Sequence, residues 1–188
     1  MSIYVGIDIG TTKVCTVVAR EEGSGKMRIL GVGIEPSAGI RKGSVVDIDA
    51  ATKAVELSVD KAERTAGLEI NSARVSLAGS HVSSINSRGV VGVHRQVIDE
   101  DDVLRAMDAA RAVAIPHNRE VIEIIQRGFT IDGQDGIRMP IGMHGYRLEV
   151  EAHIITASAS TVDNLRQVVG NSGIEVASFV LNLSLIHI

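Results

Sequence analysis

A short apolar run containing one carboxylate opens the chain and leads directly into a polar turn. Tyr4 to Ile9 is apolar except for Asp8, as in a fully buried strand. Burying a carboxylate without a partner is costly, so packing alone does not explain Asp8. Gly10 to Lys13 then turns the chain, and the β-branched run from Val14 to Ala19 predicts a second strand. Residues 3–19 therefore predict a β-hairpin with a polar tip.

The tip of this hairpin has the composition of a phosphate-binding loop. Glycine lets a backbone approach a phosphate closely, successive N–H groups form an anion-binding concavity, and Thr11, Thr12 and Lys13 add donors. Asp8 can hold the hydration shell of Mg2+, which binds through one or two carboxylates plus phosphate. The Walker loop and the dinucleotide fingerprint differ, because a helix follows the strand there. The motif alone leaves two interpretations open, a phosphate site that includes Gly10 or an ordinary polar turn.

Composition and charge restrict the other classes of function. The 188 residues have a formal charge of −4 and no basic stripe with interleaved aromatics, so nucleic acid is not an expected partner. The single cysteine, Cys15, excludes a disulfide within the chain and is expected to be a small buried hydrophobe. The sequence has neither the pattern of a secretory signal nor an apolar run of about 18 residues. We therefore expect a cytosolic globular protein.

Hydrophobic periodicity predicts that residues 1–80 form one β-β-β-α-β segment. The hairpin is followed by a third strand, a helix and a fourth strand, over residues 27–34, 47–66 and 73–79. Asp47 or Asp49 can cap the helix, and Gly67 ends it. Residues 36–43 are predicted to be a loop rich in chain breakers.

The sequence changes character after residue 80. An acidic cluster, Asp99 to Asp102, predicts the first turn of a helix ended by Pro116; a metal site is the alternative, but neighbouring carboxylates on a helix diverge. Strands are predicted over residues 119–131 and 146–156, with a turn at residues 132–137 between them. The exposed-looking apolar loop over residues 139–145 is either a contact surface or a cover folded over the sheet.

A βα alternation then returns. Ser160 to Asp163 predicts a helix with a capping box, and residues 174–180 predict a last strand. Residues 81–157 are therefore expected to be an insertion into a parent domain made of residues 1–80 and 158–182.

Several motifs in collinear order carry a resemblance to one family. Gly6 to Val14 alone is similar to the wider superfamily of actin, heat-shock-70 proteins and sugar kinases. With the motifs that follow, the chain resembles FtsA, the family of bacterial actin-like cell-division proteins, over residues 3–182. Those motifs are Gly31–Gly33, Pro36–Gly43, Ala78–Val91, Ile131–Ile137, Pro140–Met143, Arg147–Glu149 and His153–Thr156.

The resemblance implies a mixed α/β fold, an actin-like (ribonuclease-H-like) first lobe with a small inserted αβ subdomain. It also implies binding of ATP and Mg2+. Asp8 would order the hydration of the ion, while Gly10, Thr11, Thr12 and Lys13 would hold the β- and γ-phosphates. The catalytic residues stay unknown, and the expected activity is at most a weak ATPase in a full-length protein and none in this chain.

The resemblance further implies a role in septum formation at the cytoplasmic face of the bacterial cell membrane. FtsA proteins self-associate and bind FtsZ through a second lobe. They recruit later division proteins through the inserted subdomain and attach to the membrane through a C-terminal helix. We expect this chain to be truncated before the second lobe and that helix, because residues 183–188 do not match the family. We therefore expect the chain alone to bind Mg-ATP weakly or not at all.

Two rival functions stay open from the sequence. The first is a small-molecule kinase of the same superfamily, which needs a catalytic base that we do not find in the sequence. The second is a stand-alone protein-interaction module, in which residues 81–157 bind a partner and the rest serves as scaffold.

Overall fold

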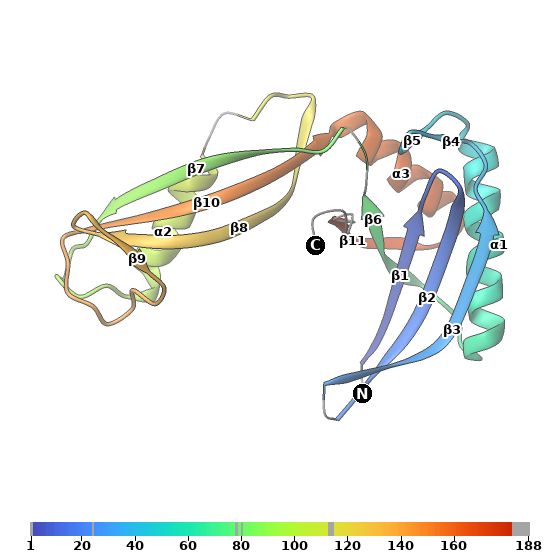
Figure 1. Ribbon diagram of the computed structural model, residues 1–188, viewed down its shortest axis with the longest axis horizontal. Helices are drawn as coiled ribbons and strands as arrows, with labels where there is room; N and C mark the ends of the chain where they lie inside the picture. Colours follow the sequence, from blue (N-terminus) through green and yellow to red (C-terminus); the bar gives the residue numbers. More distant parts are fainter. Residues whose placement is uncertain (1, 24, 78, 80, 113–114, 182–188) are drawn as a thin grey trace. The chain divides into compact units, whose positions relative to one another are not determined.

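The computed structural model describes residues 2–23, 25–77, 79, 81–112 and 115–181 (Figure 1). Contacts divide the chain into two compact units, one containing the residues up to 82 and from 158 onward, the other formed by residues 83–157. The tail at residues 183–188, predicted to be foreign to the family, lies outside the described residues. No helix within the described ranges is long and apolar enough to cross a membrane.

The first unit is built on a five-stranded sheet with the order β11-β6-β1-β2-β3. Strands β1, β2 and β3 form an antiparallel meander, while β6 runs parallel to β1, and β11 runs parallel to β6. The strand bounds are β1 Ile3–Ile9, β2 Lys13–Glu22, β3 Lys26–Pro36, β6 Ser72–Leu77 and β11 Glu175–Leu181. The predicted strands of this unit are therefore present.

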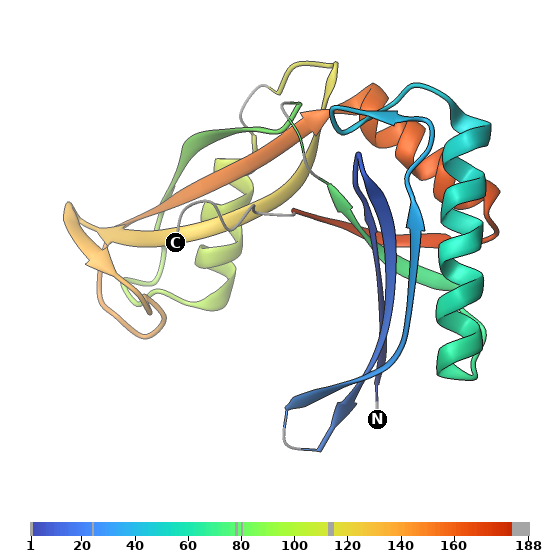
Figure 2. The same ribbon diagram turned by 45° about the vertical axis from the view of Figure 1, so that its right-hand side comes forward.

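Two helices, α1 (Ile48–Ala66) and α3 (Ala159–Asn171), pack together on one face of this sheet (Figure 2). The alternation of the strands sends one row of apolar side chains to that face, including the buried Ile7, Ile9 and Val14. The backbone of β3 approaches α1 closely, because a Cβ on Gly33 would lie 1.8 Å from the Ser58 carbonyl oxygen.

The predicted boundaries of α1 are confirmed, whereas the predicted start of α3 is wrong. Asp47 caps α1 by accepting a hydrogen bond from the Ala50 N–H at 3.0 Å, and Gly67 ends the helix at φ 69°. Helix α3 begins one residue before Ser160, so the expected capping box does not form. Its N-cap residue, Ser158, makes no side-chain cap bond, and Asp163 pairs instead with Arg166 at 2.7 Å.

The segment predicted to be an irregular loop contains a small hairpin. Strands β4 (Ile40–Arg41) and β5 (Ser44–Val45) pair around a turn in which Lys42 and Gly43 both have positive φ. Strands of two residues are too short to give a periodic signal in the sequence.

The second unit is a four-stranded sheet with the order β7-β10-β8-β9, and helix α2 (Glu100–Arg111) packs against β7. The strand bounds are β7 Ser83–Gly92, β8 Arg119–Ile131, β9 Gln134–Ile137 and β10 Arg147–Ser158. The turn predicted over residues 132–137 is wrong in extent. Only Asp132 and Gly133, both at positive φ, form the turn, and the following residues pair back as β9.

The acidic cluster starts helix α2, as predicted. Asp99 accepts the Asp102 N–H at 3.0 Å, and the Asp102 carboxylate accepts the Asp99 N–H at 3.2 Å, which completes a capping box. The bond from the Asp102 N–H holds the pKa of the Asp99 carboxyl below its ordinary value. The helix ends at Arg111, several residues before Pro116.

Candidate functional site

The carboxylate of Asp8 lies on the face of the first sheet opposite the helices. Its neighbours Ile7 and Ile9 point toward α1, so the pleat sends Asp8 to the other face. The side chain is half-buried rather than fully buried as the sequence suggested. No helix of the described residues covers this face, and the apolar run therefore forms a strand buried on one side only.

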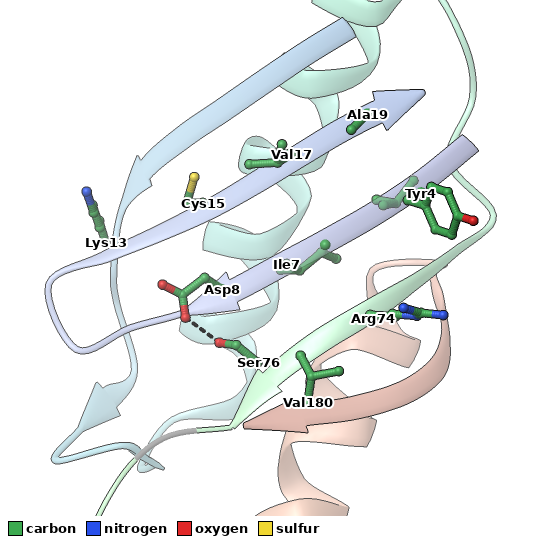
Figure 3. Close-up of a pocket in the computed structure, with 12 residues that line it drawn as sticks. Tyr4, Ile7, Asp8, Lys13, Cys15, Val17, Ala19, Arg74, Ser76 and Val180 are labelled. Atoms are coloured by element: carbon green, nitrogen blue, oxygen red, sulfur yellow. Dashed lines mark hydrogen bonds between the residues drawn. The ribbon is translucent and has the colours of Figure 1, made fainter. Parts of the chain in front are cut away.

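Ser76 on the neighbouring strand donates a hydrogen bond to Asp8 (Figure 3). The parallel register pairs Gly6 with Arg74 and Ile7 with Val75, which places Ser76 beside Asp8. The Ser76 hydroxyl donates to Oδ1 of the carboxylate. Ser76 is a site residue that the sequence analysis missed. The polar alternation within residues 73–79 was visible, but the pairing of this strand with the first one was not.

The polar turn closes tightly between β1 and β2. The Gly10 N–H donates to the Lys13 carbonyl at 3.0 Å, and a Cβ on Gly10 would lie 2.9 Å from that same oxygen. The Ser37 N–H donates to the Thr12 carbonyl at 3.0 Å and supports the turn from behind. Thr11, Thr12 and Lys13 are exposed, so their donor groups can reach a ligand, whereas Gly10 leaves room for the Lys13 carbonyl.

Asp8, Lys13 and Ser76 share a pocket of about 550 Å3 on the open face of the sheet (Figure 3). Strands β1, β2, β6 and β11 contribute the lining, with Cys15, Val17, Ala19 and Val180 as its less polar members. Cys15 is half-buried and lines the pocket, so its expected full burial is wrong.

The far end of the same pocket carries an aromatic ring under a cation. The guanidinium of Arg74 lies 5.8 Å from the centre of the Tyr4 ring, and the Tyr4 hydroxyl donates to Glu21 at 3.0 Å. Arg74 therefore lies toward the end of the pocket away from Asp8 (Figure 3). One end of the pocket has a carboxylate, a hydroxyl and an ammonium group, and the other has the Tyr4 ring and the Arg74 guanidinium.

The donor set at the first end fits a hydrated magnesium ion beside phosphate. Mg2+ prefers oxygen ligands, keeps several waters, and uses a carboxylate together with substrate phosphates. The turn adds hydroxyl, ammonium and backbone N–H groups, which are the donors that phosphate oxygens accept from. The structure thus brings all the sequence-predicted residues (Asp8, Gly10, Thr11, Thr12 and Lys13) to one end of one hairpin.

The inserted unit carries its own polar cluster on the sheet. Glu149, whose side chain is 8% exposed, pairs with Arg147 at 3.0 Å and with Arg88 at 3.4 Å. Arg88 also reaches Glu151 at 3.5 Å. These charges balance one another across the pairing of β7 with β10, and opposite charges on neighbouring strands favour that pairing.

An exposed apolar loop lies in the same unit. Met139 is 78% exposed and Ile141 is 50% exposed, and the loop is tied to residues 96–98 by backbone hydrogen bonds. Two of these bonds join Gly142 N–H to the Ile98 carbonyl at 2.8 Å and Gly145 N–H to the Gln96 carbonyl at 3.0 Å. The apolar side chains are thus presented by a loop with a fixed backbone.

A sheet with this strand order, a polar β1–β2 turn at its end and an inserted αβ unit defines the first lobe of an actin-like protein. Comparisons with a family model and with a solved structure agree with this class. The family model described as "SHS2 domain inserted in FTSA" matches residues 79–156. A solved structure, the PilM–PilN type IV pilus biogenesis complex, shares the fold with a TM-score of 0.62 at 13% identity, covering 95% of this chain and 47% of that one.

Curated relatives give the family. The chain is 38% identical to the cell division protein FtsA of Pseudomonas aeruginosa over 95% of its length, and 42% identical to that of Borreliella burgdorferi over 96%. It is therefore a homologue of the N-terminal part of FtsA, as the resemblance indicated. The chain spans less than half of those relatives, 43% and 44% of their lengths.

Proposed function

We propose that this chain supplies the phosphate- and magnesium-binding part of the ATP site in a cell-division adaptor of the FtsA type. The observation that carries the proposal is the β1–β2 hairpin, in which Asp8 and Lys13 line one pocket and the exposed Thr11 and Thr12 lie in the turn between them. In FtsA-type proteins the base and the far side of the phosphates would be bound by a second lobe.

Each residue of the hairpin has a distinct role in this proposal. Asp8 accepts hydrogen bonds from water molecules bound to Mg2+, and when bound the ion would neutralise phosphate charge. Lys13 pairs with phosphate oxygens, and the hydroxyl and N–H groups of Thr11 and Thr12 donate to them. Gly10 keeps the turn closed through its bond to the Lys13 carbonyl.

The adaptor role is the wider part of the proposal. ATP would act as a structural switch for self-association, and FtsZ and the cytoplasmic face of the membrane would be reached through parts outside this chain. The inserted unit would recruit later division proteins, and its exposed loop at Met139 and Ile141 is the surface that supports this role.

Titration of the 15N-labelled chain with Mg-ATP, followed by amide chemical shifts, tests the site. We expect shifts that saturate only at high ligand concentration, with a Kd weaker than about 100 μM, and that centre on Asp8, Thr11, Thr12 and Lys13. NMR detects such weak complexes, so low affinity does not hide the site.

Two site variants and one control make the titration specific. Asp8→Asn should remove the gain that Mg2+ gives, and Lys13→Ala should weaken binding with or without the ion. Lys26→Ala is the matched control, because Lys26 also begins a strand but lies at the opposite end of β2, beside Glu22. Shifts that map elsewhere, or that survive both site variants, would contradict the proposal.

A further inference from the structure

Ser76 is placed by sheet topology to control the orientation of the Asp8 carboxylate. Strand β1 is central in the sheet, and its parallel neighbour β6 carries Ser76 at the level of Asp8. The Ser76 hydroxyl donates to Oδ1 of Asp8, and both side chains project from the open face into the same pocket (Figure 3). The hydrogen bond joins residues 68 positions apart in the sequence.

The bond restricts the orientation of the Asp8 carboxylate. Asp8 is half-buried at the end of a strand, where its terminal torsion is soft and its two oxygens could face in several directions. A donor fixed to a neighbouring strand selects one direction. A carboxylate has about four acceptor sites, so the bond from serine occupies only part of its capacity to accept hydrogen bonds, including those from waters of a metal ion.

The chemical type of the donor also matters. A hydroxyl orients the carboxylate without cancelling its charge, whereas an arginine or lysine at the same position would form an ion pair and compete with a cation. The cation that β6 does carry, Arg74, is held over the Tyr4 ring at 5.8 Å, toward the other end of the pocket. The strand thus places a neutral donor beside Asp8.

We propose that Ser76 is a positioning residue for magnesium: it holds the Asp8 carboxylate in the orientation that receives the hydrated ion with the nucleotide. This inference rests on the proposed function, because it concerns the same site. A purely structural role, in which Ser76 only satisfies a half-buried carboxylate, would affect stability and leave the magnesium dependence of binding unchanged.

The test compares ATP affinity with Mg2+ and with the ion removed by EDTA, in the whole 188-residue chain. The ratio of the two Kd values is the magnesium gain. We expect Ser76→Ala to reduce this gain about tenfold, as loss of a partner that orients a metal-binding group does, while the Kd measured in EDTA stays the same. Ser76→Thr keeps a hydroxyl and should retain most of the gain.

Matched controls separate the site from the fold. Ser72→Ala removes a serine at the exposed start of the same strand and should leave the gain unchanged. Mn2+ in place of Mg2+ supplies a spectroscopic signature, because it broadens amides near the ion. With Mn-ATP, broadening at Thr11 and Thr12 should be strong in the wild type and in Ser76→Thr, and weak in Ser76→Ala.

The outcomes distinguish the two proposals. A magnesium gain that Asp8→Asn abolishes but Ser76→Ala leaves intact would overturn the role of Ser76 and keep the site. Loss of affinity in Ser76→Ala that is equal with and without magnesium would show a structural role only. Absence of any magnesium-dependent shift in the wild type would overturn the proposed site, and the role of Ser76 with it.

Discussion

At the scale of single residues, the candidate site joins the turn that follows Asp8 to Ser76 on a neighbouring strand. The stretch from Asp8 to Lys13 is local, so its composition and order predict both the hairpin and the phosphate-binding donors. Ser76 could not be predicted, because its role depends on which strand lies beside β1. Strand order is set by packing of the whole sheet, so the residues around a single serine do not indicate it.

A buried pair of hydroxyls joins the sheet to helix α1. Thr16 and Ser58 are both fully buried, their hydroxyl oxygens are 2.8 Å apart, and the Ser58 hydroxyl donates to the Gly33 carbonyl at 3.0 Å. Periodicity assigned α1 an apolar stripe and gave no reason to expect a serine within its contact surface.

Replacing Ser58 by alanine should therefore destabilise the fold. The Ser58→Ala variant leaves a buried carbonyl without this donor, and we expect a loss of about 1–3 kcal/mol in the free energy of unfolding, measured by urea denaturation. The exposed Ser72→Ala serves as the control with little change. Equal stability of the two variants would show that the hydrogen bonds of the buried pair do not offset the cost of desolvating its hydroxyls.

At the scale of elements, strand β7 and helix α2 approach so closely that only glycine fits between them. A Cβ on Gly89 would lie 1.9 Å from the Ala106 carbonyl oxygen and 2.5 Å from the Ala110 N, both backbone atoms. Gly92 lies on the same strand and has nothing within 4 Å of a Cβ. The two glycines look alike in the sequence, and only the packing separates them.

The Gly89→Ala variant should destabilise the inserted unit by more than about 2 kcal/mol, because backbone atoms cannot move aside cheaply. Gly92→Ala is the matched control on the same strand and should be nearly neutral. Thermal unfolding, monitored by amide exchange in residues 83–157, measures the destabilisation in both variants. Similar destabilisation by the two changes would contradict the close contact of β7 with α2.

Helix α2 should also respond to pH through its cap. The pKa of Asp99 is lowered in the folded state by the Asp102 N–H, so its charge stabilises the fold above the ordinary carboxyl pKa of about 3.9, and this stabilisation is lost as pH falls through the folded value. Asp99→Asn keeps an acceptor that does not titrate.

The difference in unfolding temperature between wild type and Asp99→Asn should therefore change between neutral pH and about pH 3, with the wild type losing more on acidification. Other carboxylates titrate equally in both proteins and cancel in the comparison. A difference that stays constant over this range would exclude the Asp99 charge as a source of stability.

The helix ends also show where local sequence is sufficient. Asp47 could be predicted as one of two candidate caps, because an acceptor precedes an apolar periodic run. For α2 the acidic cluster predicted the start of the helix, and the structure shows that Asp99 is its cap. The start of α3 was misplaced because β10 continues without a break to Ser158 and the helix follows at once. The serine that begins the expected capping box is then already inside the helix, whose position is set by packing against α1.

At the scale of the whole molecule, the mixed α/β fold with an inserted unit could be predicted because the βα alternation is interrupted and then returns. The sheet face that no helix of the described residues covers could not be predicted, because covering helices are a property of packing rather than of one strand. That open face explains why the apolar run at Asp8 lines a pocket instead of a closed core. The chain also spans under half of its FtsA relatives, and the proposed role is therefore restricted to the phosphate side of an ATP site.

The most direct test compares Mg-ATP with Mg-tripolyphosphate as ligands of the 188-residue chain, using the same NMR titration. If this chain binds only phosphates and the ion, adenosine adds nothing, and the two Kd values should agree within about threefold with shifts at the same residues. A Kd for Mg-ATP in the low micromolar range, at least about tenfold tighter than for tripolyphosphate, would contradict the account, as would failure of both ligands to shift Thr11, Thr12 and Lys13.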